Sequence, residues 1–241
     1  MSAVAKSSPL GQNAFLVAYL SALAANPLRT KMITSGFFSA LAEILAGKLA
    51  GVAPATKVSE KEAAQQQPLR LLKAYAEAAG INERAAKMAF YGFFISAPMG
   101  HVLTGLLQKA FAGKTSTKDK ILQIITSNLT VAVFANTVYL SCMAYINGAR
   151  GVDRISKAVK ASFWPVMRVT WLTSPVTIAF AQNYLPPEVW EPFFTFTRFI
   201  LATYFNTVAK KRQMALARAE AAKGRGKTTD GDLEKGAAQG K

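Results

Sequence analysis

The residues that could do chemistry are few, and the sharpest signal comes from three charges inside apolar stretches. Glu43, Arg168 and Arg198 each interrupt a long run of hydrophobic residues. A charge at the centre of a bilayer costs about 2.5–3.5 kcal/mol on insertion scales, so such residues usually face protein or a water-filled cavity. We therefore predict that Glu43 pairs with Arg168 or Arg198. The excess cation would then line a pathway that favours small anions or neutral polar solutes.

Residues suited to metal or nucleophilic chemistry are scarce. The chain has one cysteine, Cys142, and one histidine, His101, which excludes an intramolecular disulfide framework and a cysteine-based zinc site. No GxxxxGK[ST], GxGxxG or HExxH pattern occurs. His101 lies in an apolar run, where a hydrogen-bonded core histidine is the commoner role and a gate or pH sensor the rarer one. We therefore expect no enzymatic activity, metal or cofactor.

Small and polar residues recur along single faces of the apolar runs. At about 100° per residue, two stripes of small residues form that suit close helix packing. They are Ser35, Ser39 and Gly47 beside Glu43, and Gly92, Ser96 and Gly100. Further polar faces hold Thr130, Thr137 and Asn206. Two interpretations stay open: close packing with hydroxyls bonded to neighbouring carbonyls, or a hydrated lumen lined by hydroxyl and amide groups.

The elements that must position these residues are long apolar runs. Hydrophobic residues make up 51% of the 241 residues and charged residues 17%, whereas soluble domains are typically about a quarter charged. The runs cover 30–50, 85–112, 121–147, 162–184 and 193–209. They are long enough for membrane helices, which need about 20 residues, and they do not alternate as barrel strands do. We predict an all-α, multispanning transmembrane helix bundle with four to five membrane-crossing helices plus amphipathic helices.

The remaining segments are polar or short. We expect a polar N-terminus at 1–12 and a helical bundle over 13–212, in which 13–25 is too short to cross a bilayer core. A polar linker covers 51–68. The basic tail at 213–241 is expected to be partly helical and then disordered.

The charge balance is strongly basic, with a formal net charge of +16. Such a balance is often typical of nucleic-acid binding, but here the basic residues lie mostly between apolar runs, as they do beside membrane helices. We therefore expect a lipid bilayer as the partner, and no nucleic acid. Because Lys210 opens a basic stop after the fifth run, we place the tail on the cytosol-like side and the acidic connector 186–192 on the other. Assembly into a homo-oligomer is left open.

Several short elements occur in an order and spacing that resemble one family of integral organelle membrane proteins. They are Asn26-Pro27, Ala97-Pro98-Met99-Gly100-His101, Trp164-Pro165, and Tyr204 with Asn206 and Thr207 ahead of the basic stop. The second matches a Gly-Pro-x-x-His element of the family that contains the twenty-two-kilodalton peroxisomal membrane protein and its mitochondrial relative, Mpv-seventeen. The chain departs from that pattern at Ala97, where relatives usually have glycine.

The resemblance implies a multispanning protein, usually drawn with four spans and both termini in the cytosol. It implies residence in the peroxisomal membrane or the mitochondrial inner membrane, and we favour the peroxisome. It also implies a small-solute channel that affects membrane permeability, with small metabolites or ions as its cargo. The alternative is a structural or assembly protein of the peroxisomal membrane that does not conduct.

Overall fold

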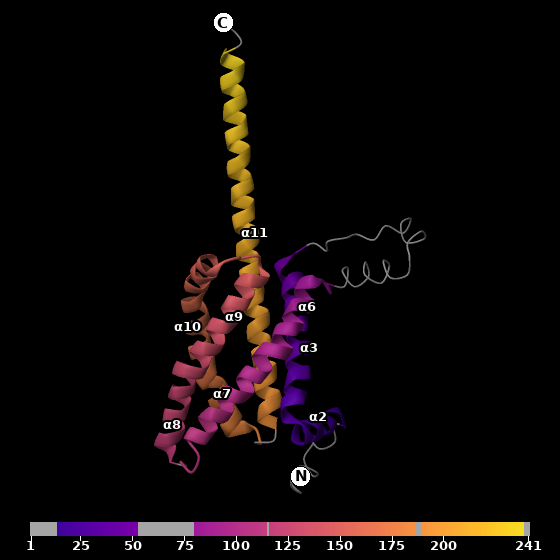
Figure 1. Cartoon of the computed structure of the whole chain (residues 1–241), viewed down its shortest axis with the longest axis vertical. Helices are drawn as coiled ribbons and strands as arrows, with labels where there is room; N and C mark the ends of the chain where they lie inside the picture. Colours follow the sequence, from indigo (N-terminus) through magenta and orange to yellow (C-terminus); the bar gives the residue numbers. More distant parts are fainter. Residues whose placement is uncertain (1–13, 53–79, 115, 187–188, 239–241) are drawn as a thin grey trace, which may run out of the picture.

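The structure is a computed structural model, and its regular elements in the described part of the chain are all helices (Figure 1). The described residues are 14–52, 80–114, 116–186 and 189–238. The predicted polar N-terminus at 1–12 lies outside them, as does most of the predicted linker 51–68.

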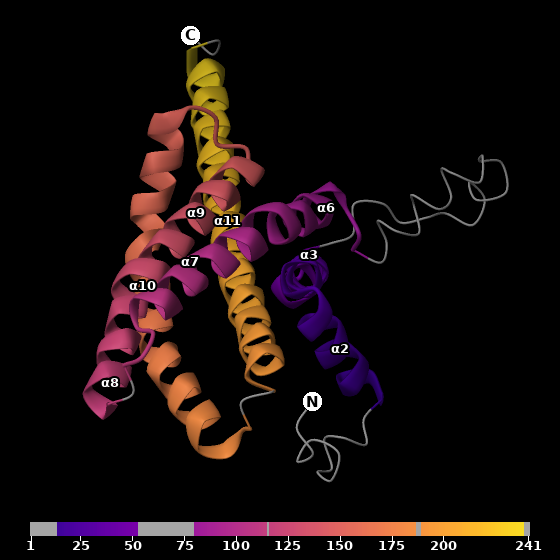
Figure 2. The same ribbon diagram turned by 60° about the horizontal axis from the view of Figure 1, so that its bottom comes forward.

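Five long helical segments form a bundle in which successive segments alternate in direction, as Figures 1 and 2 show. The short helix α2 (Ala14–Ala25) precedes α3 (Pro27–Ala50). The second segment consists of α6 (Glu83–Phe90), the π-helical turn η2 (Tyr91–Ser96) and α7 (Ala97–Ala110), and the third of α8 (Thr117–Thr126), η3 (Ser127–Val131) and α9 (Ala132–Ile146). The fourth and fifth are α10 (Val152–Tyr184) and α11 (Trp190–Ala238).

Three of the described helical segments are long and apolar enough to cross a membrane: Pro27–Ala50, Glu83–Ala110 and Thr117–Ile146. This confirms the predicted class, a multispanning helical bundle. The fourth and fifth apolar runs lie in α10 and α11, which pack beside α9 and α3 respectively. α11 starts at the end of the bundle where α10 ends, and its C-terminal part projects from the opposite end (Figure 1).

Local sequence explains where the helices begin and end. Pro27 occupies the first turn of α3, where its missing N–H costs nothing. Gly51 ends that helix at φ 73°, a left-handed conformation that glycine adopts without a steric penalty. The Asn82 side chain accepts a hydrogen bond from the Ala85 backbone N–H at 3.0 Å and so caps α6.

Two helices extend beyond the apolar runs that the sequence delimits. α10 begins at Val152 because a basic amphipathic segment continues into the run 162–184, and Pro165 and Pro175 both lie inside it. α11 continues from the run 193–209 through 213–238, further than the partial helix expected for the tail. Its residues 214–222, MALARAEAA, are mostly strong helix formers, which accounts for the extension.

The bundle packs most closely where α3 meets the second segment. A Cβ atom at Gly92 would lie 2.4 Å from the Ser35 carbonyl oxygen and 2.5 Å from Ser39 Oγ, so only glycine allows this approach. Large apolar side chains elsewhere point outward, among them Phe37 and Leu172. That distribution suits lipid as the solvent around the bundle, since helices can expose apolar surface there.

Candidate functional site: a buried charge cluster

The most concentrated polar chemistry in the described chain surrounds Glu43. This carboxylate is 1% exposed, on the face of α3 that packs against α6 and α11. Its Oε1 lies 2.6 Å from Arg84 Nε of α6 and 2.6 Å from Lys210 Nζ of α11. We call Glu43, Arg84 and Lys210 the buried charge cluster; it joins three helical segments through one carboxylate.

The predicted pairing of Glu43 with Arg168 or Arg198 is therefore wrong. α10, which carries Arg168, packs on α9 rather than on α3. Arg198 lies on α11, but twelve residues before Lys210, which is about 18 Å along a helix at 1.5 Å per residue. The helix order of the bundle decided which cation reaches Glu43, and that order is not encoded in the spacing of residues along one run.

A hydrogen bond between α9 and α11 lies beside the buried charge cluster. The Tyr139 hydroxyl of α9 donates to Asn206 Oδ1 at 2.5 Å, and Asn206 is fully buried one helical turn before Lys210. Burial without a partner is costly for an amide, and this bond satisfies the Asn206 carbonyl oxygen while it links α9 to α11. A further link joins α9 to α10, where Asn136 Nδ2 donates to Thr170 Oγ1 at 3.3 Å.

Not every polar atom of this region is paired within the described residues. Glu43 Oε2, Arg84 Nη2 and Asn206 Nδ2 are buried and have no hydrogen-bond partner there. The buried charge cluster also carries one more positive charge than negative. Buried polar atoms of this kind are usually met by ordered water in natural proteins. The arrangement joins three helical segments through ion pairs to one buried carboxylate.

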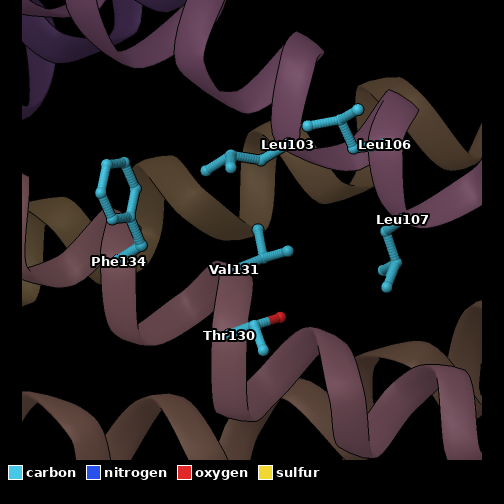
Figure 3. Close-up of a pocket in the computed structure, with 6 residues that line it drawn as sticks. All are labelled: Leu103, Leu106, Leu107, Thr130, Val131 and Phe134. Carbon is cyan, nitrogen blue, oxygen red and sulfur yellow. The ribbon is translucent and has the colours of Figure 1, made fainter.

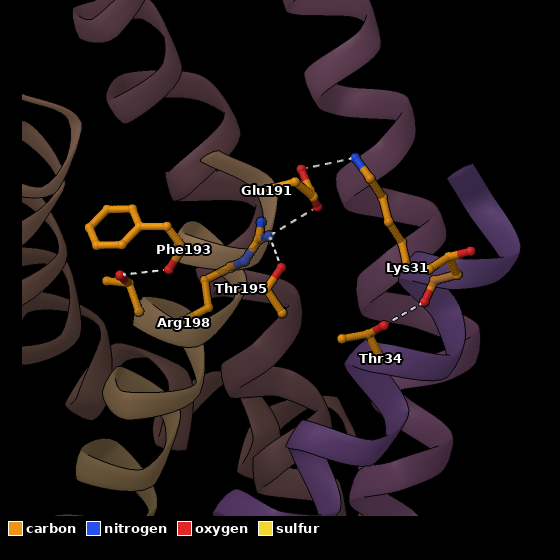
Figure 4. A network of polar contacts seen from close by, with 8 residues as sticks. Lys31, Thr34, Glu191, Phe193, Thr195 and Arg198 are labelled. Carbon is orange, nitrogen blue, oxygen red and sulfur yellow. Dashed lines mark hydrogen bonds and ion pairs between the residues drawn. The ribbon is translucent and has the colours of Figure 1, made fainter. Parts of the chain in front are cut away.

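A second charge cluster lies toward the other end of α3 and α11 (Figure 4). Lys31 Nζ is 3.2 Å from Glu191 Oε2, and Arg198 Nη2 is 3.5 Å from Glu191 Oε1. Arg198 also donates to Thr195 Oγ1 at 3.2 Å. We call Lys31, Glu191 and Arg198 the exposed charge cluster. Nearby, burial raises the pKa of Tyr19 in α2 above its ordinary value, so the neutral phenol persists there.

The other polar residues proposed from sequence to line a pathway do not face a shared interior. Thr130 and Thr137 are exposed, and their hydroxyls donate to the carbonyls of Thr126 and Val133 in their own helix. Arg168 is exposed on α10. A threonine that bonds to the carbonyl four residues earlier satisfies its hydroxyl locally, so it need not turn inward. His101 is half-buried in α7.

The predicted small-residue stripes are present only in part. Gly92 meets Ser35 and Ser39 as described, and a Cβ at Gly47 would lie 3.5 Å from Lys210 Nζ. Ser96 is half-buried at the end of η2, but a Cβ at Gly100 would meet nothing within 4 Å. The π-helical turn η2 explains the difference, because its wider turn breaks the four-residue repeat between Gly92 and Gly100.

The motif residues taken from the family resemblance lie apart from the buried charge cluster. Pro98 stands in the first turn of α7, and Trp164 is 57% exposed beside the exposed Pro165 on α10. Sequence reasoning also missed three residues of the buried region. In the sequence, Arg84 lies at the edge of an apolar run, Lys210 belongs to a basic segment that follows a run, and Tyr139 lies among apolar residues. None of these positions indicates a buried polar contact. The spacing of Asn206 and Lys210 on one face of α11 was the available signal.

A groove between α7 and the third segment offers no polar chemistry (Figure 3). It has a volume of about 390 Å³ and is lined by Leu103, Leu106, Leu107, Thr130, Val131 and Phe134. The hydroxyl of Thr130 is already bonded to its own helix. Among the residues that the structure describes, no group of His, Cys, Asp and Glu is placed to hold a metal ion. The groove therefore resembles lipid-facing surface rather than a binding site for polar solutes.

Fold and site together define a multispanning helical membrane protein whose interior charges join its helices. Comparison with known proteins identifies relatives of the chain. Its residues 144–206 match the model of the Mpv17 / PMP22 family. The Woronin body membrane protein wscA of Aspergillus fumigatus is 46% identical over 207 residues, covering 86% of this chain and 82% of that protein. The chain belongs to the Mpv17 / PMP22 family, as the sequence motifs predicted.

Two further relatives extend this comparison. The Woronin sorting complex protein of Neurospora crassa is 41% identical over 208 residues, which cover 86% of this chain and 61% of that protein. The peroxisomal membrane protein PMP22 of Arabidopsis thaliana is 23% identical over 202 residues, covering 84% of this chain and 93% of that protein. No solved structure matches the chain.

Proposed function

We propose that this chain is an integral protein of a peroxisomal or peroxisome-derived membrane that works by assembling with other proteins there. Its similarity to a Woronin body membrane protein and to a Woronin sorting complex protein supports the assembly role. Its similarity to peroxisomal membrane proteins of a plant and of Bos taurus supports the location. A small-solute channel, which the family resemblance implies, is the alternative that the experiment below separates from it.

One observation carries the proposal: the polar groups inside the bundle are used to join helices. Glu43 is 1% exposed, and its neighbours Ala42 and Ala46 on α3 are 0% exposed. A conducting interior needs polar side chains that water can reach, as in the pathways of membrane transporters. Here the buried charge cluster occupies the junction of three helical segments, while Thr130 and Thr137 point outward.

Flux through reconstituted vesicles tests this proposal. The purified full chain is inserted into liposomes loaded with a sugar, an organic acid or a salt, and efflux is measured between pH 5 and pH 8. We expect the same leakage as from protein-free liposomes. Efflux above that background, altered in selectivity by Asn206→Ala but not by the control Thr137→Ala, would establish a conducting interior and overturn the assembly role.

The proposed location has its own test. A fluorescently tagged full chain should co-fractionate with peroxisomal membrane markers and stay in the pellet after an alkaline carbonate wash. Enrichment with mitochondrial inner membrane markers instead would overturn the location and leave the assembly role to be judged by the flux experiment.

A further inference from the structure

Arg168 is a cation on the outer face of α10. Its side chain is exposed. Within the part of the chain that the structure describes, it makes no ion pair, unlike Arg84, Lys210 and Arg198. Arg168 thus differs from these three cations, each of which has a carboxylate oxygen within 4 Å.

Contacts with η3 and α9 fix the depth of Arg168 in the bundle. Met167 is the residue before it, and its Sδ accepts a hydrogen bond from Asn136 Nδ2 at 3.3 Å. Trp171, three residues after it, donates to the carbonyl oxygen of Asn128 at 3.0 Å. Arg168 therefore lies level with residues 128–136, which span η3 and the start of α9. The middle of the apolar span Thr117–Ile146 falls in that same interval.

In a bilayer centred on that span, Arg168 would lie far from bulk water. The middle of a 30-residue helix lies about 22 Å from either end at 1.5 Å per residue. The hydrocarbon core of a bilayer is about 30 Å thick, so its edge is about 15 Å from the centre. Lipid phosphates lie beyond that edge. An arginine at this position facing only lipid would cost about 2.5–3.5 kcal/mol on insertion scales.

The surface around Arg168 is otherwise apolar and open. Trp164 is 57% exposed, Leu172 is 74% exposed and Val176 is 65% exposed. At four-residue spacing these side chains share one face of α10 with Arg168. We call this surface the Arg168 face. It combines the apolar contact area that a membrane helix offers another helix with one charge that needs a carboxylate.

We propose that the Arg168 face docks a transmembrane helix of a second membrane protein, and that this helix carries an Asp or Glu at mid-depth. The proposal rests on the assembly role proposed above and names the class of partner. Arginine binds a carboxylate through two parallel N–H···O bonds, which makes it the side chain suited to such a pairing. The apolar residues on either side of Arg168 supply the packing surface.

A second copy of this chain does not supply the missing carboxylate. Glu43 is buried and already contacts two cations, and Glu191 is paired with Lys31 and Arg198. The remaining acidic residues lie outside the apolar runs. Charge complementarity therefore favours a different protein as the partner.

A designed peptide tests the pairing directly. The purified full chain, labelled with a donor dye, is reconstituted in phosphatidylcholine vesicles with an acceptor-labelled polyleucine transmembrane peptide that has Glu, or Gln, at its centre. We expect the Glu peptide to bind at least tenfold more tightly than the Gln peptide by energy transfer. Arg168→Leu should abolish this preference, and Arg168→Lys should retain part of it. Arg168→Glu should reverse it toward a peptide with a central Lys.

The matched control is Arg198→Leu, which removes another exposed arginine and should leave the preference for the Glu peptide unchanged. Equal binding of the two peptides by the unaltered chain, or an undiminished preference in Arg168→Leu, would overturn the proposal. Energy transfer between two labelled copies that disappears in Arg168→Leu would assign the face to a second copy and also overturn it.

The vesicle flux assay separates this proposal from the function on which it rests. If the vesicles leak no more than the background and the chain does not prefer the Glu peptide, the docking proposal falls and the assembly role stands. Solute efflux that Arg168→Leu abolishes would place Arg168 in a conducting pathway, and both proposals would then fall.

Discussion

Two charge clusters join α3 to α11, and they have the same composition but opposite surroundings. Each consists of one carboxylate and two cations. In the buried charge cluster, Glu43 is 1% exposed and both ion-pair distances are 2.6 Å. In the exposed charge cluster, the Glu191 side chain is 28% exposed, and the distances are 3.2 Å and 3.5 Å. The same kinds of charged group are therefore partly exposed to water in the Glu191 cluster and shielded from it around Glu43.

The difference teaches that burial decides what an ion pair does in this bundle. Exposed pairs contribute about 0–1 kcal/mol, because water and salt compete with them. Breaking a buried pair costs about 3–5 kcal/mol, since it leaves an uncompensated charge in a medium of low dielectric constant. The buried charge cluster should thus determine whether α3, α6 and α11 stay together, while the exposed charge cluster should contribute little.

The largest expected effect is that of Glu43→Gln. The substitution preserves shape but leaves the buried Lys210 and the half-buried Arg84 without their shared carboxylate, so we expect a loss of about 3–5 kcal/mol in stability. The measurement is the thermal unfolding of purified protein in mild detergent, followed by tryptophan fluorescence. An unfolding midpoint equal to that of the unaltered chain would contradict the assignment of Glu43 to a closed, structural cluster.

Gly92→Ala should have the next largest effect, a loss of about 3 kcal/mol in stability. The added methyl group would lie 2.4 Å from the Ser35 carbonyl oxygen, so the backbones of α3 and η2 must separate. The measurement is the amount of monodisperse protein that elutes from a size-exclusion column after extraction from membranes, which falls as the protein loses stability. Gly100→Ala is the matched control, because its methyl group would meet nothing within 4 Å. Equal losses from both variants would show that the close approach at Gly92 is not what matters.

Tyr139→Phe should destabilise by about 1 kcal/mol, at the lower end of the range for an unsatisfied buried acceptor. It removes the only described donor to Asn206 Oδ1, which is otherwise enclosed. Thermal unfolding is again the readout, with Thr137→Val as the control because that hydroxyl is exposed and bonds only within its helix. A larger effect from the control would reverse our assignment of inward and outward polar faces.

The smallest expected effect is that of Glu191→Gln, at about 0–1 kcal/mol. Its two cations are partly exposed and can be hydrated when the carboxylate is lost. The thermal unfolding midpoint is measured in about 50 mM and about 500 mM salt, because the Debye length shortens over that range. At both concentrations, the midpoint of this variant should differ little from that of the unaltered chain. A loss as large as that of Glu43→Gln would erase the contrast between the two clusters.

The sequence was sufficient for the class of fold because lipid imposes it. Long apolar runs without alternation leave the helix bundle as the solution, and the structure adds three clear spans in its described part. The burial of Glu43 was also predictable, because it shares a face with Ser35 and Ser39. These inferences depend only on the periodicity within a single helix.

What the sequence could not supply was the identity of neighbours across helices. Glu43 pairs with Arg84 and Lys210 because α6 and α11 pack on α3, and both cations lie just outside the apolar runs. The π-helical turn η2 also shifted the expected stripe, which removed Gly100 from the contact. The threonine hydroxyls of the third segment bond within their own helix, so their presence did not require a polar interior.

The central claim is that bulk water does not reach the interior around the buried charge cluster, and cysteine labelling tests it most directly. In a Cys142→Ser background, Ala42→Cys and Ala46→Cys place thiols at positions that are 0% exposed, with Asn147→Cys in the exposed α9–α10 connection as the positive control. The account predicts that a charged, water-soluble thiol reagent labels Asn147→Cys in intact membranes and labels the two interior thiols only after unfolding. Rapid labelling of the interior thiols in intact membranes would show a hydrated lumen and contradict the account.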